Sequence, residues 1–101
     1  MKPSYEVRAT FQQNEGKRGE RITMKVQYAN LNPDTVLDKS IVRIPDYSIF
    51  DVMKHEADGT YTWSYTIPWE APLQTYRIDV YAIDTNGNRG AVETVSFKVT
   101  G

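Results

Sequence analysis

The chain has 101 residues, the size of one domain, and its 12 basic and 13 acidic residues give a formal net charge of −1. A chain so close to neutral lacks the clustered cations of nucleic-acid-binding proteins, and we expect no nucleic-acid partner. It has no cysteine, which excludes disulfides and thiolate metal sites. It also has no apolar stretch for a signal peptide or a membrane span, so we expect no membrane insertion.

Four strands are predicted in the first half of the chain. Apolar and polar residues alternate over residues 4–12 and 20–29, and this period of two gives a β-strand one apolar and one polar face. Two weaker runs follow, residues 40–45 and 49–55. Pro45 ends the first of them, and the second has no clear apolar face. The turn residues between these runs include Asn14-Glu15-Gly16 and Asn32-Pro33-Asp34.

Three more strands are predicted in the second half, where the alternation is clear. It runs over residues 60–67, 74–84 and 91–99, with Asn86-Gly87 as the turn signal before the last run. Seven short strands with no helical segment between them predict an all-β antiparallel sandwich of two sheets, each with one wet face. We assign the whole chain, residues 1–101, to this single domain.

A longer pattern in the second half resembles a known family. Asp58-Gly59-Thr60-Tyr61-Thr62 opens one strand, and Thr75-Tyr76-Arg77-Ile78-Asp79-Val80-Tyr81-Ala82-Ile83-Asp84 leads into a turn with Asn86-Gly87-Asn88. This pattern is similar to that of bacterial immunoglobulin-like modules, which occur in cell-surface, S-layer and adhesin proteins and beside secreted glycoside hydrolases. The fibronectin type III family is the alternative. The resemblance implies a seven-stranded immunoglobulin-like β-sandwich, an extracellular or cell-surface location and neighbouring domains as partners.

Two aromatic residues are predicted to be structural. Trp63 is at the centre of the apolar face of the strand at 60–67, between Tyr61 and Tyr65, and we expect it to be buried between the sheets. Tyr76 begins the strand at 74–84. In this fold a tyrosine there often bonds its hydroxyl to the upstream backbone, and a plain core tyrosine is the alternative.

The chain offers few residues for catalysis. Its only histidine, His55, would have to serve any Ser-His-Asp site, yet it stands beside Glu56 in a polar stretch without a nucleophile motif. We interpret it as a solvated histidine in a turn. We therefore expect no enzyme activity and no cofactor.

The turn after the strand at 74–84 is the best candidate for a metal site. Asp84, Asn86 and Asn88 place oxygen atoms at alternate positions, and Ca²⁺ prefers such ligands. However, Arg89 stands where an EF-hand has glycine, and Asn86-Gly87 is explained by a hairpin turn because both residues tolerate positive φ. We favour the plain turn and keep calcium as the alternative.

Three aromatic residues fall outside the inward pattern: Tyr47, Trp69 and Tyr81. Exposed aromatic rings can stack on sugar rings or anchor a protein interface. Trp69 follows Pro68 where a loop begins, so it can instead fold over an open end of the sandwich as a lid. We favour the lid, because tryptophan is highly buried on average.

Two functions fit these observations. The first is a non-catalytic structural, spacer or adhesion module of a larger bacterial cell-surface or secreted protein. Its partners would be neighbouring domains and a cell-surface glycan or protein. The second is a carbohydrate-binding accessory module that uses Trp69 with Tyr47 or Tyr81. Because the chain ends just past its last predicted strand, we expect one unit of a longer string, monomeric when isolated.

Overall fold

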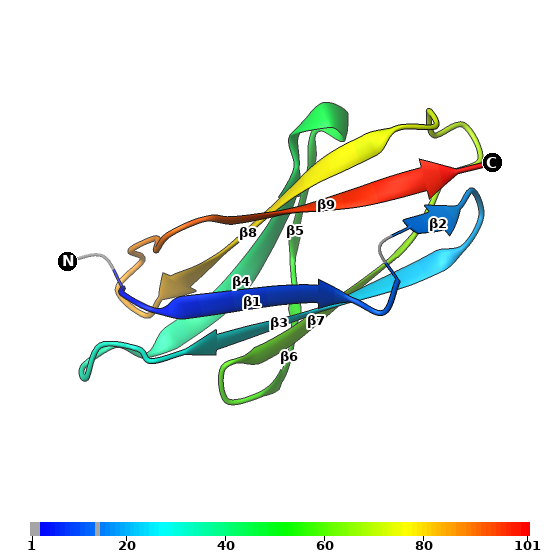
Figure 1. Cartoon of the computed structure of the whole chain (residues 1–101). Helices are drawn as coiled ribbons and strands as arrows, with labels where there is room; N and C mark the ends of the chain where they lie inside the picture. Colours follow the sequence, from blue (N-terminus) through cyan, green and yellow to red (C-terminus); the bar gives the residue numbers. More distant parts are fainter. Residues whose placement is uncertain (1–2, 14) are drawn as a thin grey trace.

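The protein is a sandwich of two β-sheets packed face to face (Figure 1), and the computed structural model describes residues 3–13 and 15–101. The predicted all-β sandwich is confirmed, although the described residues form nine strands rather than seven. One sheet has the strand order β1-β3-β7-β6 and the other β2-β9-β8-β4-β5. The elements in chain order are β1 (Glu6–Phe11), β2 (Glu15–Lys17), β3 (Arg21–Ala29), β4 (Leu37–Ile44), the 3₁₀ helix η1 (Pro45–Tyr47), β5 (Ile49–Val52), β6 (Lys54–Ala57), β7 (Thr60–Thr66), β8 (Thr75–Asp84) and β9 (Glu93–Thr100).

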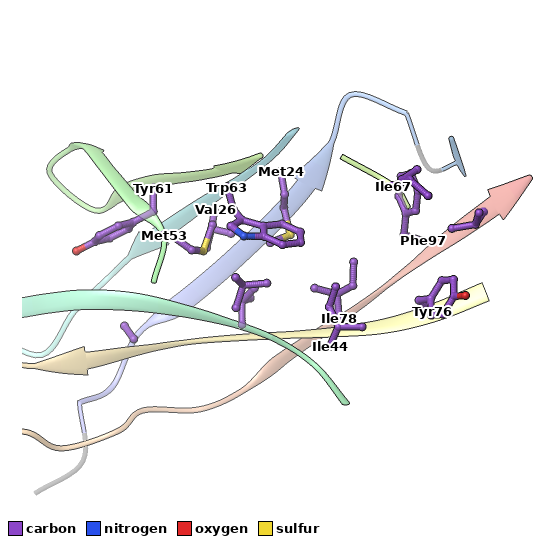
Figure 2. Packing of buried hydrophobic residues seen from close by; sticks show 14 of the residues in the cluster. Met24, Val26, Ile44, Met53, Tyr61, Trp63, Ile67, Tyr76, Ile78 and Phe97 are labelled. Atoms are coloured by element: carbon purple, nitrogen blue, oxygen red, sulfur yellow. The ribbon is translucent and has the colours of Figure 1, made fainter. Parts of the chain in front are cut away.

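The core lies between the two sheets and is built from the alternating apolar residues. Side chains at every second position of a strand share one face, so the register of β3 with β7 places Met24 opposite Trp63. In Figure 2, these two side chains face Ile44 and Ile78 of the other sheet. Trp63 is only 4% exposed, as predicted, and its indole Nε1 donates a hydrogen bond to Asp51 at 3.1 Å.

The predicted strand at 49–55 is two strands in two different sheets. β5 pairs with β4, whereas β6 pairs with β7. Met53 lies between them with its side chain buried, and its N–H donates to the carbonyl of Ser40 at 2.9 Å. Because the chain crosses from one sheet to the other here, this segment has no consistent apolar face.

The turn predicted at Asn14-Glu15-Gly16 is instead a short strand where the structure describes it. Asn14 lies outside the described residues, and Glu15–Lys17 forms β2, which pairs with β9 in parallel. The sandwich is therefore not wholly antiparallel. Gly16 is buried, and a Cβ there would lie 3.1 Å from side-chain atoms of both Ile67 and Phe97. Glycine thus allows β2 to approach the core closely.

The sandwich is elongated, with extents of 46 × 23 × 17 Å. β1 starts at one end and β9 finishes at the other (Figure 1). In the part of the chain that the structure describes, no helix has the length and apolar character needed to cross a bilayer. We call the end where β9 finishes the C-terminal pole, which comprises the loops at 18–20, 45–48 and 67–74. The opposite N-terminal pole comprises the start of β1 and the loops at 30–36 and 85–92.

Candidate functional site

The loop at residues 67–74 joins β7 to β8 at the C-terminal pole and is fixed to the sandwich along its length. Ala71, at its centre, is buried. Four hydrogen bonds from donors outside the loop end on its carbonyls: from Gly19 N to Ile67 at 2.7 Å, from Arg18 Nε to Ala71 at 2.7 Å, from the Tyr76 hydroxyl to Pro72 at 2.7 Å, and from Val99 N to Gln74 at 3.0 Å. A loop bonded at four points holds its outward side chains in defined positions.

Two apolar side chains point outward from this fixed loop. Trp69 is 74% exposed, so the predicted lid is wrong. Its ring lies beside the turn at Gly19, where a Cβ would come within 2.5 Å of the indole, and it leaves most of its surface to solvent. Leu73 is 54% exposed and lies next to Gly101. The C-terminal pole therefore displays an aromatic and an aliphatic side chain from one rigid loop.

Tyr76 anchors the loop through its hydroxyl. It donates to the carbonyl of Pro72, four residues upstream, so the bond predicted for this tyrosine is present. Because a carbonyl can only accept, the Tyr47 hydroxyl, 2.6 Å away, donates to Tyr76 in turn. Burial, followed by the bond with Tyr47 and the charge of Asp46, raises the pKa of Tyr76. Tyr47 itself is partly exposed and serves to brace Tyr76.

Tyr81 does not belong to this surface, and the expectation that its ring is exposed is wrong. Its side chain is outside the core between the sheets, as the alternation predicted, yet it is only 3% exposed. Ile41 is its cross-strand partner on β4, and the Arg89 guanidinium lies 5.2 Å above the ring. Such a cation–π contact covers the face that a sugar would need.

The sheet that carries Tyr81 also holds a buried carboxylate, Asp79. Arg43 donates to it at 3.1 Å, Thr94 donates at 2.8 Å, and Arg77 approaches to 3.7 Å. Burial alone would raise its pKa, but the bonds from Thr94 and Arg43 and the charge of Arg77 outweigh burial, so the pKa of Asp79 lies below its ordinary value. The cluster ties β8 to β4 and β9.

The proposed calcium ligands lie at the N-terminal pole, where Asp84 is buried and engaged within its own turn. Its Oδ1 accepts the backbone N–H groups of Asn86, at 3.0 Å, and Asn88, at 2.8 Å. The predicted hairpin turn is present, because Ile83 and Arg89 form an antiparallel bridge across it and Asp84 N–H donates to the carbonyl of Asn88 at 2.9 Å. Of these turn residues only Gly87 has a positive φ, +82°. Within residues 3–13 and 15–101, no three His, Cys, Asp or Glu side chains gather as a metal site would require.

His55 lies on β6 rather than in a turn, and it is exposed. Its ring centroid is 5.0 Å from that of Tyr61. The neighbouring Glu56 accepts a hydrogen bond from Thr62 at 2.8 Å on the adjacent strand. These contacts join β6 to β7, so His55 and Glu56 belong to the edge of a sheet.

Comparisons with known proteins find similar folds among solved structures. No family model matches the chain, and no curated protein matches it. The PKD domain of an M14-like peptidase from Thermoplasmatales archaeon SCGC AB-540-F20 matches with a TM-score of 0.73 and 14% identity, over 94% of this chain and 93% of that one. The CbhA fibronectin(III)-like modules of Clostridium thermocellum match with a TM-score of 0.65 and 17% identity, over 98% of this chain and 47% of that one.

A third solved structure, a Niemann-Pick type C2 protein from the Japanese carpenter ant, matches with a TM-score of 0.53 and 7% identity, over 99% of this chain and 94% of that one. The TM-scores of the first two structures establish the architecture, whereas sequence identities this low leave the activity open. The chain has an immunoglobulin-like fold.

In this immunoglobulin-like domain, the sequence identified Trp69 as a candidate binding residue. It did not identify Leu73, which is also exposed on the loop, or Arg18 and Gly19, which hold the loop in place. Leu73 lies between the strands predicted at 60–67 and 74–84, and its apolar character outside the period-two pattern was its only signal. Arg18 and Gly19 were missed because they act through backbone contacts with residues about 50 positions away. Such long-range pairs leave no trace in local periodicity.

Proposed function

We propose that this immunoglobulin-like domain is a non-catalytic spacer and interaction module of a larger bacterial cell-surface or secreted protein. The observation that carries the proposal is the placement of the chain ends. β1 enters at one pole of an elongated, hydrogen-bonded sandwich and β9 leaves at the other, so domains attached to the two ends would be held apart along the long dimension.

The related structures support this proposal. Two of them are named as parts of larger proteins, a domain of a peptidase and modules of CbhA. Both match nearly the whole of this chain, so the comparison concerns the complete sandwich rather than a fragment. A domain of this kind contributes position and rigidity, while other domains carry the chemistry.

Replacement in the parent protein tests the spacer role. Residues 3–100 would be exchanged for an unrelated β-sandwich of similar length whose ends also lie at opposite poles. Because a spacer acts through length and rigidity, we expect the parent's activity or surface display to be retained. Replacement by a flexible Gly/Ser linker of the same residue number should reduce it. Loss with both replacements would show that this domain has a specific activity and would contradict the spacer role.

A carbohydrate-binding accessory role is the second candidate, and the exposure of Trp69 favours it. An exposed indole on a fixed loop can stack on a sugar ring. The role loses Tyr81, which is buried, and retains Tyr47 only as a partly exposed brace of Tyr76. Retardation of the domain in gels that contain soluble polysaccharides, abolished by Trp69→Ala, would support it.

A further inference from the structure

The outer face of the sheet that contains β4, β5 and β8 carries an excess of positive charge. Side chains that alternate with the core residues of these strands point outward, and cations outnumber acids among them. They are Lys39, Arg43 and Arg77, with Arg89 from the turn after β8, against the carboxylate of Asp79. Because the whole chain has a net charge of −1, this face differs from the molecule as a whole and suits an anionic ligand.

Two of these arginines line one open groove. Arg43, on β4, and Arg89, in the loop at 85–92, border a groove of about 540 Å³. Among the described residues, the rest of its lining is uncharged and consists of Gly87, Asn88, Gly90, Ala91 and Val92. The volume falls within the range of about 300–1,000 Å³ that is typical of ligand sites. The groove therefore offers a ligand two guanidinium groups, and no carboxylate of the described lining residues competes with it.

Both guanidinium groups are held in position and still have donors to offer. Asp79 accepts a hydrogen bond from Arg43 Nη2 at 3.1 Å, and the Arg43 side chain is 39% exposed. The Arg89 guanidinium lies 5.2 Å from the centre of the Tyr81 ring and joins none of the ion pairs within the described residues. A guanidinium has several N–H donors and can bind a carboxylate through two of them at once. The arginines therefore form a site that is arranged before a carboxylate binds.

An exposed aromatic ring lies beside Arg43. Phe50, on the edge strand β5, is the cross-strand partner of Arg43, and partners of this kind have Cβ atoms about 4.5–5.5 Å apart. Phe50 is 61% exposed. Its ring offers a flat apolar face on which a sugar ring can stack. An acidic peptide would use the guanidinium groups alone, whereas an acidic sugar would use both the charges and the ring.

We propose that this face binds an acidic polysaccharide through the carboxylate of a uronate residue. Arg43 and Arg89 bind the carboxylate in the groove, and a sugar ring of the same polymer stacks on Phe50. The site lies on the outer face of a sheet, away from Trp69 at the C-terminal pole, and it does not depend on the spacer role. It gives the module a ligand of defined chemistry, a carboxylated glycan.

Affinity electrophoresis of residues 1–101 tests the proposal with three uronate polymers: polygalacturonate, alginate and hyaluronate. We expect at least one of them to retard the protein, and we expect added salt to weaken the retardation because the contact is between charges. Highly methyl-esterified polygalacturonate is the matched control, since it keeps the sugar backbone and loses the carboxylates. Retardation by none of the three polymers, or equal retardation by polygalacturonate and its methyl ester, would overturn the proposal.

Matched variants locate the site on the molecule. Arg89→Gln and Phe50→Ala both change exposed side chains, so the melting temperature should change little. By calorimetric titration with the polymer that binds, we expect Arg89→Gln to raise the Kd about tenfold, and Phe50→Ala to raise it several-fold. Arg8→Gln removes the same charge from the outer face of the other sheet and should leave the Kd unchanged. An equal effect of Arg8→Gln would show that net charge alone drives binding and would overturn the site.

Poly-glutamate distinguishes an acidic polysaccharide from an acidic peptide, because it carries carboxylates without sugar rings. We expect it to bind more weakly than the uronate polymer, and we expect Phe50→Ala to leave its Kd unchanged. Binding as tight as that of the uronate polymer, with the same dependence on Arg89, would replace the polysaccharide with an acidic peptide. The spacer role is tested separately by domain replacement, so either proposal can fail without the other.

Discussion

At the scale of single residues, Tyr76 combines packing with two hydrogen bonds. Its ring is buried, and its hydroxyl donates to the carbonyl of Pro72 and accepts from Tyr47. Tyr76→Phe keeps the ring but leaves both partners unpaired, which should cost about 1–3 kcal/mol of unfolding free energy. Urea denaturation would measure the loss. Tyr47→Phe is the control: it removes only the bond between the two hydroxyls, at a more exposed site, and should lower the free energy of unfolding by less. Equal stability of Tyr76→Phe and the wild type would contradict the anchoring role of the Tyr76 hydroxyl.

Asp79 makes stability depend on pH. Its pKa in the folded protein lies below the ordinary value of about 3.9, so its contribution is fully present above that pH. The contribution is lost as the pH falls through the lower, folded-state pKa, because the carboxylate is then protonated in the folded protein as well. Asp79→Asn should therefore be less stable than the wild type at pH 7.

Urea denaturation of Asp79→Asn and the wild type from about pH 7 to about pH 2 would check this dependence. We expect the difference in unfolding free energy between the two proteins to shrink below about pH 4. A difference that stays constant over the whole range would show that Arg43 and Thr94 do not stabilise the ionised form.

At the scale of elements, β2 depends on a glycine. Gly16→Val would place side-chain atoms against Ile67 and Phe97, where even a Cβ has only 3.1 Å. Overpacking of this kind costs about 1–3 kcal/mol, and it should detach β2 from β9. Hydrogen exchange of the backbone amides in β2 and at the end of β9 would report the detachment. Gly87→Asn is the control, because nothing lies within 4 Å of a Cβ there and asparagine tolerates positive φ.

The turn between β8 and β9 should not need a metal. Asp84 Oδ1 already accepts two backbone N–H groups, so the turn is held without a metal, and Asp84 is the one carboxylate among the proposed ligands Asp84, Asn86 and Asn88. We expect the same melting temperature in millimolar EDTA and in millimolar calcium, and we expect Asp84→Ala to lower it equally in both. A rise of several degrees with calcium, abolished by Asp84→Ala, would contradict this prediction.

Elements with period-two alternation could be predicted from the sequence, and the others could not. The strands around Val26, Trp63 and Ile78 were predicted because burial of one strand face produces an alternation of apolar and polar residues in the sequence. β2 has only three residues, too few to show alternation, and its Gly16 predicts a turn because its close packing against Ile67 and Phe97 cannot be seen in the sequence. The break at Met53 was missed because both flanking strands are short edge strands with mostly exposed residues.

The candidate site was less predictable than the fold, because exposure of a single ring is decided by distant parts of the chain. Trp69 was assigned to a lid from the average behaviour of tryptophan, yet its loop is tied down by Arg18 and Tyr76, which leaves the ring outside. Tyr81 was placed on the correct face, but Arg89 covers it. Periodicity assigns a side chain to a face of the sheet and says nothing of what lies over that face.

At the scale of the whole molecule, the shape is longer than the average for this chain length. The radius of gyration is 14.1 Å, whereas a typical domain of 100 residues has about 13 Å. The first long strand, β1, and the last, β9, lie in different sheets, and β2 connects them because it follows β1 in sequence and pairs with β9 in parallel. A force along the long dimension therefore reaches both sheets.

Pulling on the two ends should meet high mechanical resistance. Force on Ser4 and Gly101 acts along β1 and β9, so their hydrogen bonds with β3, β8 and β2 are loaded in shear and must break together. Because the chain has no cysteine, added cysteines give unique attachment points for single-molecule pulling. Attachment at Gln74→Cys and after Gly101 is the control: both points lie at the C-terminal pole, so β9 would unzip from β8 one bond at a time. We expect this control to unfold at a several-fold lower force, and equal forces in the two geometries would show that the ends are not coupled through the β2–β9 pair.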